Sequence, residues 1–529
     1  MRRKLAILLA LAVSGILAGC NAAGGGRPPC PAAQRCVNVA ISGDPYTLDP
    51  NKYVLSVEAF VFKNFLVGLT AQDSLGRTIP GMATSWSTSA DGLTWTFRLR
   101  EAKWSDGQPV IAADFVTSLR RHVDSKTASP WASPLFVIAG AEDAAAGKVS
   151  PDAIGALAPD PRTVILKLRS PTPYLAEMMA SFGLPVPSHA LKRWGDRWAE
   201  VGNYPSNGPY LLETRAMGDR IVLTANPEYF GRKPCFDKLN MFVTPSPITA
   251  ERRVASGEMD IAMRFDPNRT SLLKKTMPGY VRTPPGLGFT RVAYNLGVPA
   301  LRDRRVREAL AMSIDREFLT QKLLGGGNVP LTTVSPPGMP GYSVAPPAWA
   351  SWPLEKRVES ARKLMRAAGY TSDKPLRLDY KFPASQPRTV AAFLQSKWRA
   401  IGADISLSSV DSQIHFNDMM VRDFELGFDN FNAEWMDPNQ FLELSRKTDP
   451  NNYPGYDNTI FDAALERANL QSDPARRLSM LGRAEAILAR DNVNASLYGY
   501  SPTQLVNPAI TGFDDNLSNA HPAQFWCRK

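Results

Sequence analysis

Few side chains of this sequence have the types and the spacing that catalysis requires. The histidines are His122, His189, His415 and His521, and none lies at metal-ligand spacing from another. Residues 341–345, G-Y-S-V-A, nearly match a nucleophile elbow, but they lie in a proline-rich stretch without a strand before or a helix after them. No phosphate-binding or dinucleotide-binding glycine pattern occurs. The sequence therefore predicts no enzyme activity, no catalytic residue, no cofactor and no metal site.

The first cysteine lies where a lipid-modified residue is expected. Residues 1–4 are basic at three of four positions, and residues 5–18 form an apolar run that is too short to span a bilayer. Residues 17–20, L-A-G-C, match a bacterial lipobox. We expect a signal peptide over 1–19, lipidation of Cys20 and a Gly/Pro-rich tether over 20–36. An ordinary leader with a chance cysteine is the alternative. Either leader predicts export, and the lipid would hold the protein at the membrane in the periplasm or on the cell surface.

The remaining four cysteines suggest disulfides. An even count in an exported protein is typical of disulfide pairing, and four thiols allow three connectivities. Cys30 with Cys36 is the local choice, which leaves Cys235 with Cys527. Free or metal-binding thiols are the alternative, but no C-x-x-C motif is present.

Composition and charge exclude several classes of protein. The chain has 529 residues, of which 44% are hydrophobic and 21% are charged, so it can bury a large core. Its 44 prolines disfavour a helical repeat array. The formal charge of +11 comes from scattered basic residues without a Lys/Arg block, so we expect no nucleic-acid partner.

The elements that would position a site alternate between strands and helices. Residues 37–41 and 93–100 show the two-residue period of half-buried strands, and 376–380 and 495–500 are also predicted strands. One helix is expected over 306–323, and others are expected over the ranges 356–368, 463–468 and 477–489. The sequence predicts a mixed α/β fold.

A succession of motifs resembles one family, the solute-binding proteins of peptide ABC transporters, family 5. The N-terminal motifs are T-L-D-P (47–50), V-G-L-T (67–70), I-P-G-M-A-T-S-W (79–86), D-G-L-T-W-T-F-R-L-R (91–100) and A-K-W-S-D-G-Q-P-V (102–110). The later ones are S-N-G-P-Y-L-L (206–212), S-G-E-M-D-I-A (256–262), the helix motif at 355–370 and A-E-W-M-D-P-N-Q-F-L (433–442). The last two look most like the oligopeptide- and murein-peptide-binding branch.

The resemblance implies a two-lobed periplasmic-binding-protein fold (type II, cluster C) with an extra domain and mixed sheets joined by hinge strands. The first lobe would be discontinuous and combine 37–66, 186–285 and 501–529. The extra domain would span 67–185 and the second lobe 286–500. Cys235 and Cys527 then share the first lobe, which agrees with the pairing above.

The resemblance also implies a ligand site between the lobes. An extended peptide would be gripped as an added strand by Asn430, Phe431 and Asn432, and by the loop Val54, Leu55 and Ser56. Glu434 occupies the position of the family's carboxylate that pairs with the ligand's α-ammonium. Family members usually carry Asp there. An exposed loop acid is the alternative interpretation of Glu434.

Other positions depart from the family pattern. The basic residues that usually bind the ligand's carboxylate align with Met419, Met420 and Phe428, and the usual disulfide of the second lobe aligns with Gly288 and Asn432. We expect these apolar residues to line the cleft. The implied function is the capture of oligopeptides and their delivery to the permease of an ABC transporter, by a monomer that contacts the membrane only through its lipid. The alternative is the same fold with a non-peptide solute such as a sugar, an opine-like amine or a metal chelate; an enzyme or a sensor lipoprotein is a more distant one.

Overall fold

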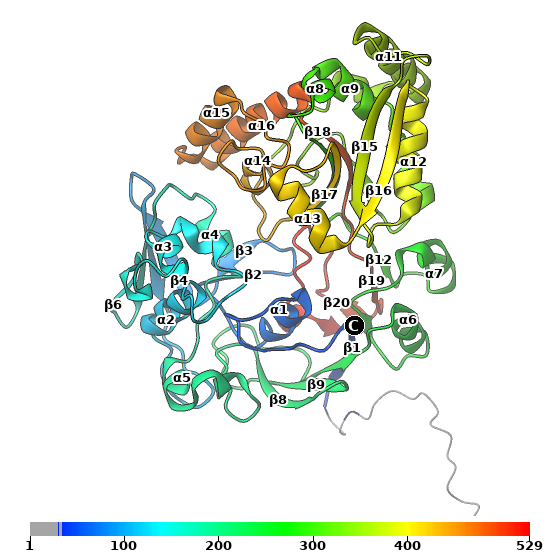
Figure 1. Cartoon of the computed structure of the whole chain (residues 1–529). Helices are drawn as coiled ribbons and strands as arrows, with labels where there is room; N and C mark the ends of the chain where they lie inside the picture. The colour runs from blue at the N-terminus through cyan, green and yellow to red at the C-terminus, as the bar shows by residue number, and fades with distance from the viewer. Residues whose placement is uncertain (1–29, 31–33) are drawn as a thin grey trace, which may run out of the picture.

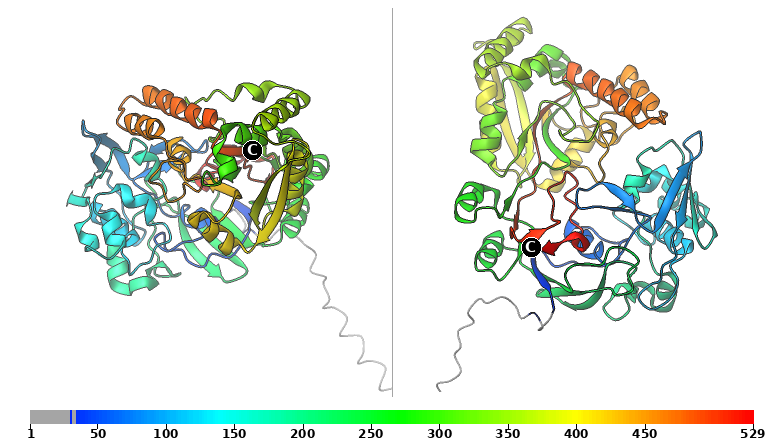
Figure 2. Two further views of the ribbon diagram at one scale, coloured as in Figure 1. Left: turned by 45° about the horizontal axis from the view of Figure 1, so that its top comes forward. Right: turned by 180° about the vertical axis from the view of Figure 1, so that it is seen from behind.

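Three sheets organise the chain, and the computed structural model describes them within Cys30 and residues 34–529. Figure 1 shows two bodies, one above the other, with the four-stranded sheet at one side of the lower body. The two further views in Figure 2 show the same division. The mixed α/β fold predicted from the sequence is confirmed. No helix in the described part of the chain is both long and apolar enough to cross a bilayer.

The seven-stranded sheet of the lower body combines three distant parts of the sequence. Its order is β12-β19-β11-β1-β10-β9-β8, and β1 pairs in parallel with both β10 and β11. The strands are β1 (Cys36–Ile41), β8 (Tyr210–Ala216), β9 (Arg220–Ala225), β10 (Lys238–Val243), β11 (Ile261–Ala262), β12 (Val281–Arg282) and β19 (Gln504–Val506). The helices of these segments are α1 (Ser56–Phe62), α5 (Ser188–Trp194), α6 (Pro247–Ala255) and α7 (Thr270–Thr276). All six residues of β1 are buried, as expected for a strand with neighbours on both edges.

The four-stranded sheet lies within the segment that follows α1. Its order is β4-β5-β7-β6, with strands β4 (Ala83–Thr88), β5 (Thr94–Leu99), β6 (Ala156–Asp160) and β7 (Thr163–Lys167). Its helices are α2 (Ala112–His122), α3 (Ala141–Ala145) and α4 (Leu175–Met178), and a short ladder joins β2 (Thr70–Gln72) to β3 (Thr78–Pro80). Trp95, Phe97 and Leu99 are buried along β5, which confirms the alternation predicted there.

The six-stranded sheet forms the upper body. Its order is β14-β18-β13-β17-β15-β16, with strands β13 (Gly288–Tyr294), β14 (Val329–Pro330), β15 (Leu376–Pro383), β16 (Ala403–Val410), β17 (Leu426–Asn432) and β18 (Asn494–Gly499). Its helices are α8 (Pro299–Arg302), α9 (Arg304–Met312), α10 (Arg316–Phe318), α11 (Leu354–Ala367), α12 (Arg388–Arg399), α13 (Ser412–Val421), α14 (Asn439–Glu443), α15 (Thr459–Asn469) and α16 (Pro474–Asp491).

The single helix expected over 306–323 is broken, so this prediction is wrong. Helix α9 ends at Met312, and Asp315 starts α10, because its side chain accepts a hydrogen bond from the Phe318 amide at 3.1 Å. A π-helical turn follows over Leu319–Leu324. The apolar spacing continues across the break, which is why it resembles one helix in the sequence.

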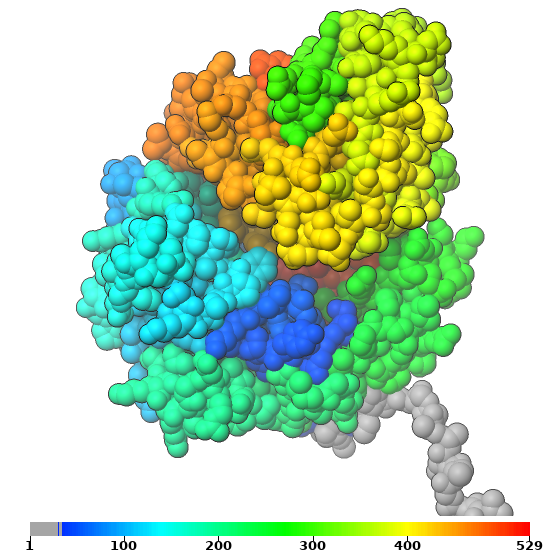
Figure 3. All heavy atoms as spheres, viewed as in Figure 1, coloured from blue at the N-terminus to red at the C-terminus, as the bar shows by residue number. Residues whose placement is uncertain are grey.

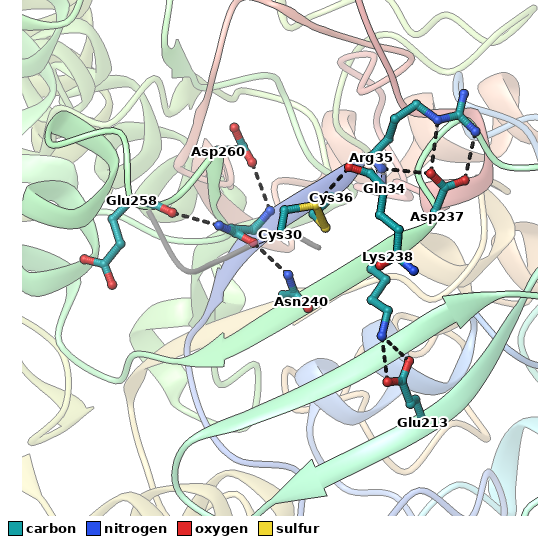
Figure 4. The surroundings of a disulfide bond; sticks show 11 residues. Cys30, Gln34, Arg35, Cys36, Glu213, Asp237, Lys238, Asn240, Glu258 and Asp260 are labelled. Atoms are coloured by element: carbon teal, nitrogen blue, oxygen red, sulfur yellow. Dashed lines mark hydrogen bonds and ion pairs between the residues drawn. A yellow bond between two sulfur atoms is a disulfide. The ribbon is translucent and has the colours of Figure 1, made fainter. Parts of the chain in front are cut away.

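Both disulfides have the connectivity that the local pairing predicted. Cys30 joins Cys36 with a Cα–Cα distance of 5.9 Å, and Cys235 joins Cys527 with a Cα–Cα distance of 5.1 Å. Figure 4 shows the first bridge where the chain enters β1, near the ion pair of Arg35 with Asp237. The second bridge attaches β21 (Cys527–Arg528), which pairs with β20 (Ile510–Thr511), to the segment between β9 and β10. The last residues are thereby held to the lower body.

Candidate functional site

A cavity of about 980 Å³ lies between the two bodies. Figure 3 shows a recess between the yellow and orange surface of the upper body and the blue and cyan surface below it. Its aromatic lining comprises Tyr53, Phe60, Trp131, Phe428, Tyr498 and Tyr500. Aromatic walls with a few polar side chains are typical of ligand sites of this size.

Glu434 lines this cavity from the upper body, directly after β17. Gln440 fixes the turn that carries it, since its side chain accepts a hydrogen bond from the Glu434 amide at 3.1 Å and donates one to the Trp435 carbonyl at 2.6 Å. The Glu434 carboxylate is half-buried and forms no ion pair within 4 Å with any described residue. Burial raises the pKa of Glu434 above its usual value, and nearby Lys63 partly opposes this shift. Among the described residues, the Glu434 carboxylate therefore has no close counterion.

The residue after Glu434 contacts the segment that carries the four-stranded sheet. The Trp435 ring stacks on Tyr174, with ring centroids 5.6 Å apart and an interplanar angle of 13°. Asp437 is structural, because it forms a buried ion pair with Arg477 at 2.6 Å and accepts a hydrogen bond from the Asn439 amide at 2.9 Å. These contacts hold the Glu434 turn on both sides.

The alternation of β17 decides which of its residues face the cavity. Phe428, Asn430 and Asn432 line it, as residues two apart on one face of a strand should. The Phe431 ring points to the other face and packs against Phe289 and Phe441, so only its backbone is placed for the strand pairing predicted at 430–432. Gly288 and Asn432 are directly opposed in the β13–β17 ladder, which places together the two positions aligned with the family's disulfide.

Met419 and Met420 do not line the cavity. We had expected them there because they align with the family's basic residues that bind the ligand's carboxylate. Met419 is fully buried on α13 in a small core with Ala293 and Phe424. Met420 is 60% exposed, because the next position on a helix lies about 100° around its axis. Of the three aligned positions, only Phe428 reaches the cavity.

A buried carboxylate shapes the predicted loop of the lower body. Glu58 is fully buried, and its Oε2 accepts hydrogen bonds from the amides of Val54 and Leu55, both at 2.7 Å. Val54 and Ser56 line the cavity. Leu55, which is 40% exposed, is not among the residues that line it.

Two basic residues that no sequence motif marked also line the cavity. Lys63 follows α1, and its Nζ donates a hydrogen bond to Ser181 Oγ at 2.9 Å. Arg264 follows β11 and is exposed in the cavity. Arg291, by contrast, is buried and paired with Asp429 at 2.6 Å, so it is not available to a ligand. A lone basic residue carries no spacing signal, and only the fold brings these two to the site.

The described residues contain no group of three or more His, Cys, Asp or Glu side chains placed to hold a metal ion. The predicted lipidation site, Cys20, lies outside the described residues.

Comparisons with known proteins agree with this architecture. The family described as "Bacterial extracellular solute-binding proteins, family 5 Middle" matches residues 77–453. The periplasmic murein peptide-binding protein MppA of Escherichia coli (strain K12) is 32% identical over 482 residues, which cover 90% of each chain. The periplasmic oligopeptide-binding protein OppA of the same strain is 32% identical over 493 residues, 91% of each chain. The fold matches MppA in its unliganded open form with a TM-score of 0.86 at 31% identity, over 94% of this chain and 98% of that one. The chain therefore belongs to the bacterial extracellular solute-binding proteins of family 5.

Proposed function

We propose that this protein captures oligopeptides in the cavity between its two bodies and delivers them to the permease of an ABC transporter. The observation that carries the proposal is an open edge on β17. Among the described residues, β15 pairs with β17 only at Leu426 and Gly427, whereas β13 pairs with it along its whole length. Apart from the Phe428 carbonyl, which lies 2.8 Å from His415 Nε2, the backbone of residues 428–432 is thus open on one side, next to the cavity that Asn430 and Asn432 line. An extended peptide can pair there as an added strand.

Glu434 supplies the charge that would orient such a peptide. The proposal places the ligand's α-ammonium at this carboxylate, which lies just beyond the open strand edge. A charge-assisted hydrogen bond in a half-buried site contributes about 1.5 to 3 kcal/mol. The two relatives described above are named as murein peptide-binding and oligopeptide-binding proteins. Their names support peptides as the ligand class.

The same proposal includes the division of the chain and its attachment. The lobes would be 37–66 with 186–285 and 501–529, and 286–500, with 67–185 as the extra domain. The seven-stranded sheet supports this, since its strands come from the three segments of the first lobe. Lipidation of Cys20 would tether a monomer to the membrane, and the periplasmic relatives support an exported location.

Native mass spectrometry of the protein purified from its own host tests the ligand class. A mixture of co-purified peptide masses is expected, because backbone pairing tolerates different side chains. One defined small molecule that is not a peptide would contradict the proposal.

Acidification is expected to weaken peptide binding, because Glu434 must be ionised to hold an ammonium group. Burial raises the pKa of Glu434, so protonation begins at a higher pH than for an exposed glutamate. As pH falls through this raised pKa, the logarithm of the association constant should fall by up to about one unit per pH unit. Above it the affinity should be constant up to about pH 7, where the ligand's own α-ammonium begins to lose its proton. Calorimetry from about pH 7 to about pH 4 measures the profile, and a flat profile in the wild type would contradict the assignment.

A further inference from the structure

The charges that line the cavity do not balance. Of the described lining residues, Lys63 and Arg264 are basic and Glu434 is acidic, so the formal charges are two positive and one negative. His521 also lines the cavity, but burial lowers its pKa to about 3, so it is neutral at any pH near 7. A ligand that carries one more carboxylate than ammonium groups would neutralise this lining. A simple peptide, with one of each at its termini, would not.

Lys63 is the cation that matters most for the anchored end of the ligand. Among the described residues, its Nζ donates a hydrogen bond to the neutral Ser181, and no carboxylate lies within 4 Å of it. It is half-buried at the end of α1 in the lower body, while Glu434 faces the cavity from the upper body. Ser181, the partner of Lys63, precedes Phe182, whose ring centroid lies 6.3 Å from that of Trp435, the residue after Glu434. Burial lowers the pKa of Lys63, and nearby Glu434 opposes this shift. Both charges are therefore parts of one subsite, without being in contact.

The arrival of a peptide changes the environment of Lys63. Once a ligand ammonium pairs with Glu434, this carboxylate no longer compensates the charge of Lys63, and two ammonium groups face each other in a half-buried site. Like charges in a site that is partly shielded from solvent repel each other more strongly than they do in water. A carboxylate on the ligand, a few ångströms from its own ammonium, removes this repulsion and gives Lys63 a partner.

We propose that Lys63 is a specificity-determining residue that selects peptides with a carboxylate side chain on one of their first two residues. The inference rests on the proposed peptide-binding function and names the substrate class of the same cavity. Only the first two side chains of an extended peptide lie within reach of a group beside the α-ammonium, since successive residues advance by about 3.3 Å. Lys192, an exposed lysine of α5 outside the cavity lining, serves as the matched control.

The test is calorimetry with two pairs of tetrapeptides that differ by one charge. The pairs are Asp-Ala-Ala-Ala with Asn-Ala-Ala-Ala, and Ala-Glu-Ala-Ala with Ala-Gln-Ala-Ala. In the wild type, the acidic member of at least one pair should bind about ten-fold more tightly than its amide partner. Lys63→Met should reduce this ratio to about two-fold or less, and Lys63→Arg should retain it. Lys192→Met removes a positive charge outside the cavity and should leave the ratio unchanged.

Each outcome separates the inference from the function on which it rests. Equal binding of acid and amide in both pairs by the wild type would overturn the role of Lys63 and leave peptide binding intact. A preference that persists in Lys63→Met, or that Lys192→Met lowers equally, would also overturn it, because the selection would then not come from Lys63. Failure of all four peptides to bind the wild type would overturn the proposed function itself. If Lys63→Met does not fold, Lys63→Gln is compared with Lys63→Arg in the same way.

Discussion

Replacing Glu434 by alanine is expected to weaken oligopeptide binding by about ten-fold or more, a loss of at least about 1.4 kcal/mol. The substitution leaves the ligand's ammonium in a half-buried cavity without a carboxylate, and truncating one partner of such a pair commonly costs about 2 to 5 kcal/mol. The backbone of the turn is held by Gln440 and by the Trp435–Tyr174 stack, so the cavity should keep its shape. Isothermal titration calorimetry with a tetrapeptide measures the change.

Two further variants control for effects other than charge. Glu434→Asp keeps the carboxylate and matches the residue usual in the family, so it should retain most of the affinity. Glu355→Ala removes an exposed acid from α11, outside the cavity lining, and should bind like the wild type. An affinity of Glu434→Ala equal to that of the wild type would remove the amino-anchor mechanism.

Loss of the Cys235–Cys527 bridge is expected to produce the largest change in stability. The bridge closes a loop with a sequence separation of 292, and the chain-entropy model gives about 4 to 6 kcal/mol for a loop of this length. The bridge ties the last strand pair to the lower body, so its removal also frees residues near the cavity lining at 517–522. We expect Cys235→Ser/Cys527→Ser to lower the midpoint of guanidinium unfolding markedly.

The short disulfide provides the matched comparison. Cys30 and Cys36 are separated by 6 residues, for which the same model gives only about 2 kcal/mol. Cys30→Ser/Cys36→Ser should therefore shift the unfolding midpoint much less. A shift equal to or larger than that of the long bridge would contradict the account of the second disulfide as the main cross-link of the lower body.

Periodicity predicted individual elements well where one face of an element is buried. The strand over 93–100 and the helices near 356–368 and 477–489 were found because apolar side chains repeat at the period of the element. The helix over 306–323 was wrong because Ser313 and Asp315 end one helix and begin another without interrupting the apolar spacing. The hydrogen bond from the Phe318 amide to the Asp315 side chain starts the second helix there.

The site was predicted in part, and the errors follow from geometry that a single sequence does not contain. The motif that ends in Glu434 marked a residue that lines the cavity, and the alternation of β17 separates Asn430 and Asn432 from Phe431. The side on which Met419 packs depends on the rotation of α13 about its axis, which an alignment of positions does not give. Lys63 reaches the cavity only because the end of α1 lies beside Ser181, which is distant in sequence.

The most direct test compares a tetrapeptide that has a free amino terminus with the same peptide after N-acetylation, by calorimetry on the wild type and on Glu434→Ala. Acetylation removes the positive charge and leaves the peptide backbone unchanged. The account predicts that the free peptide binds the wild type about ten-fold or more tightly than the acetylated one, and that this difference disappears in Glu434→Ala. Equal binding of the two peptides by the wild type would contradict the claim that Glu434 holds the ligand's ammonium in the cavity.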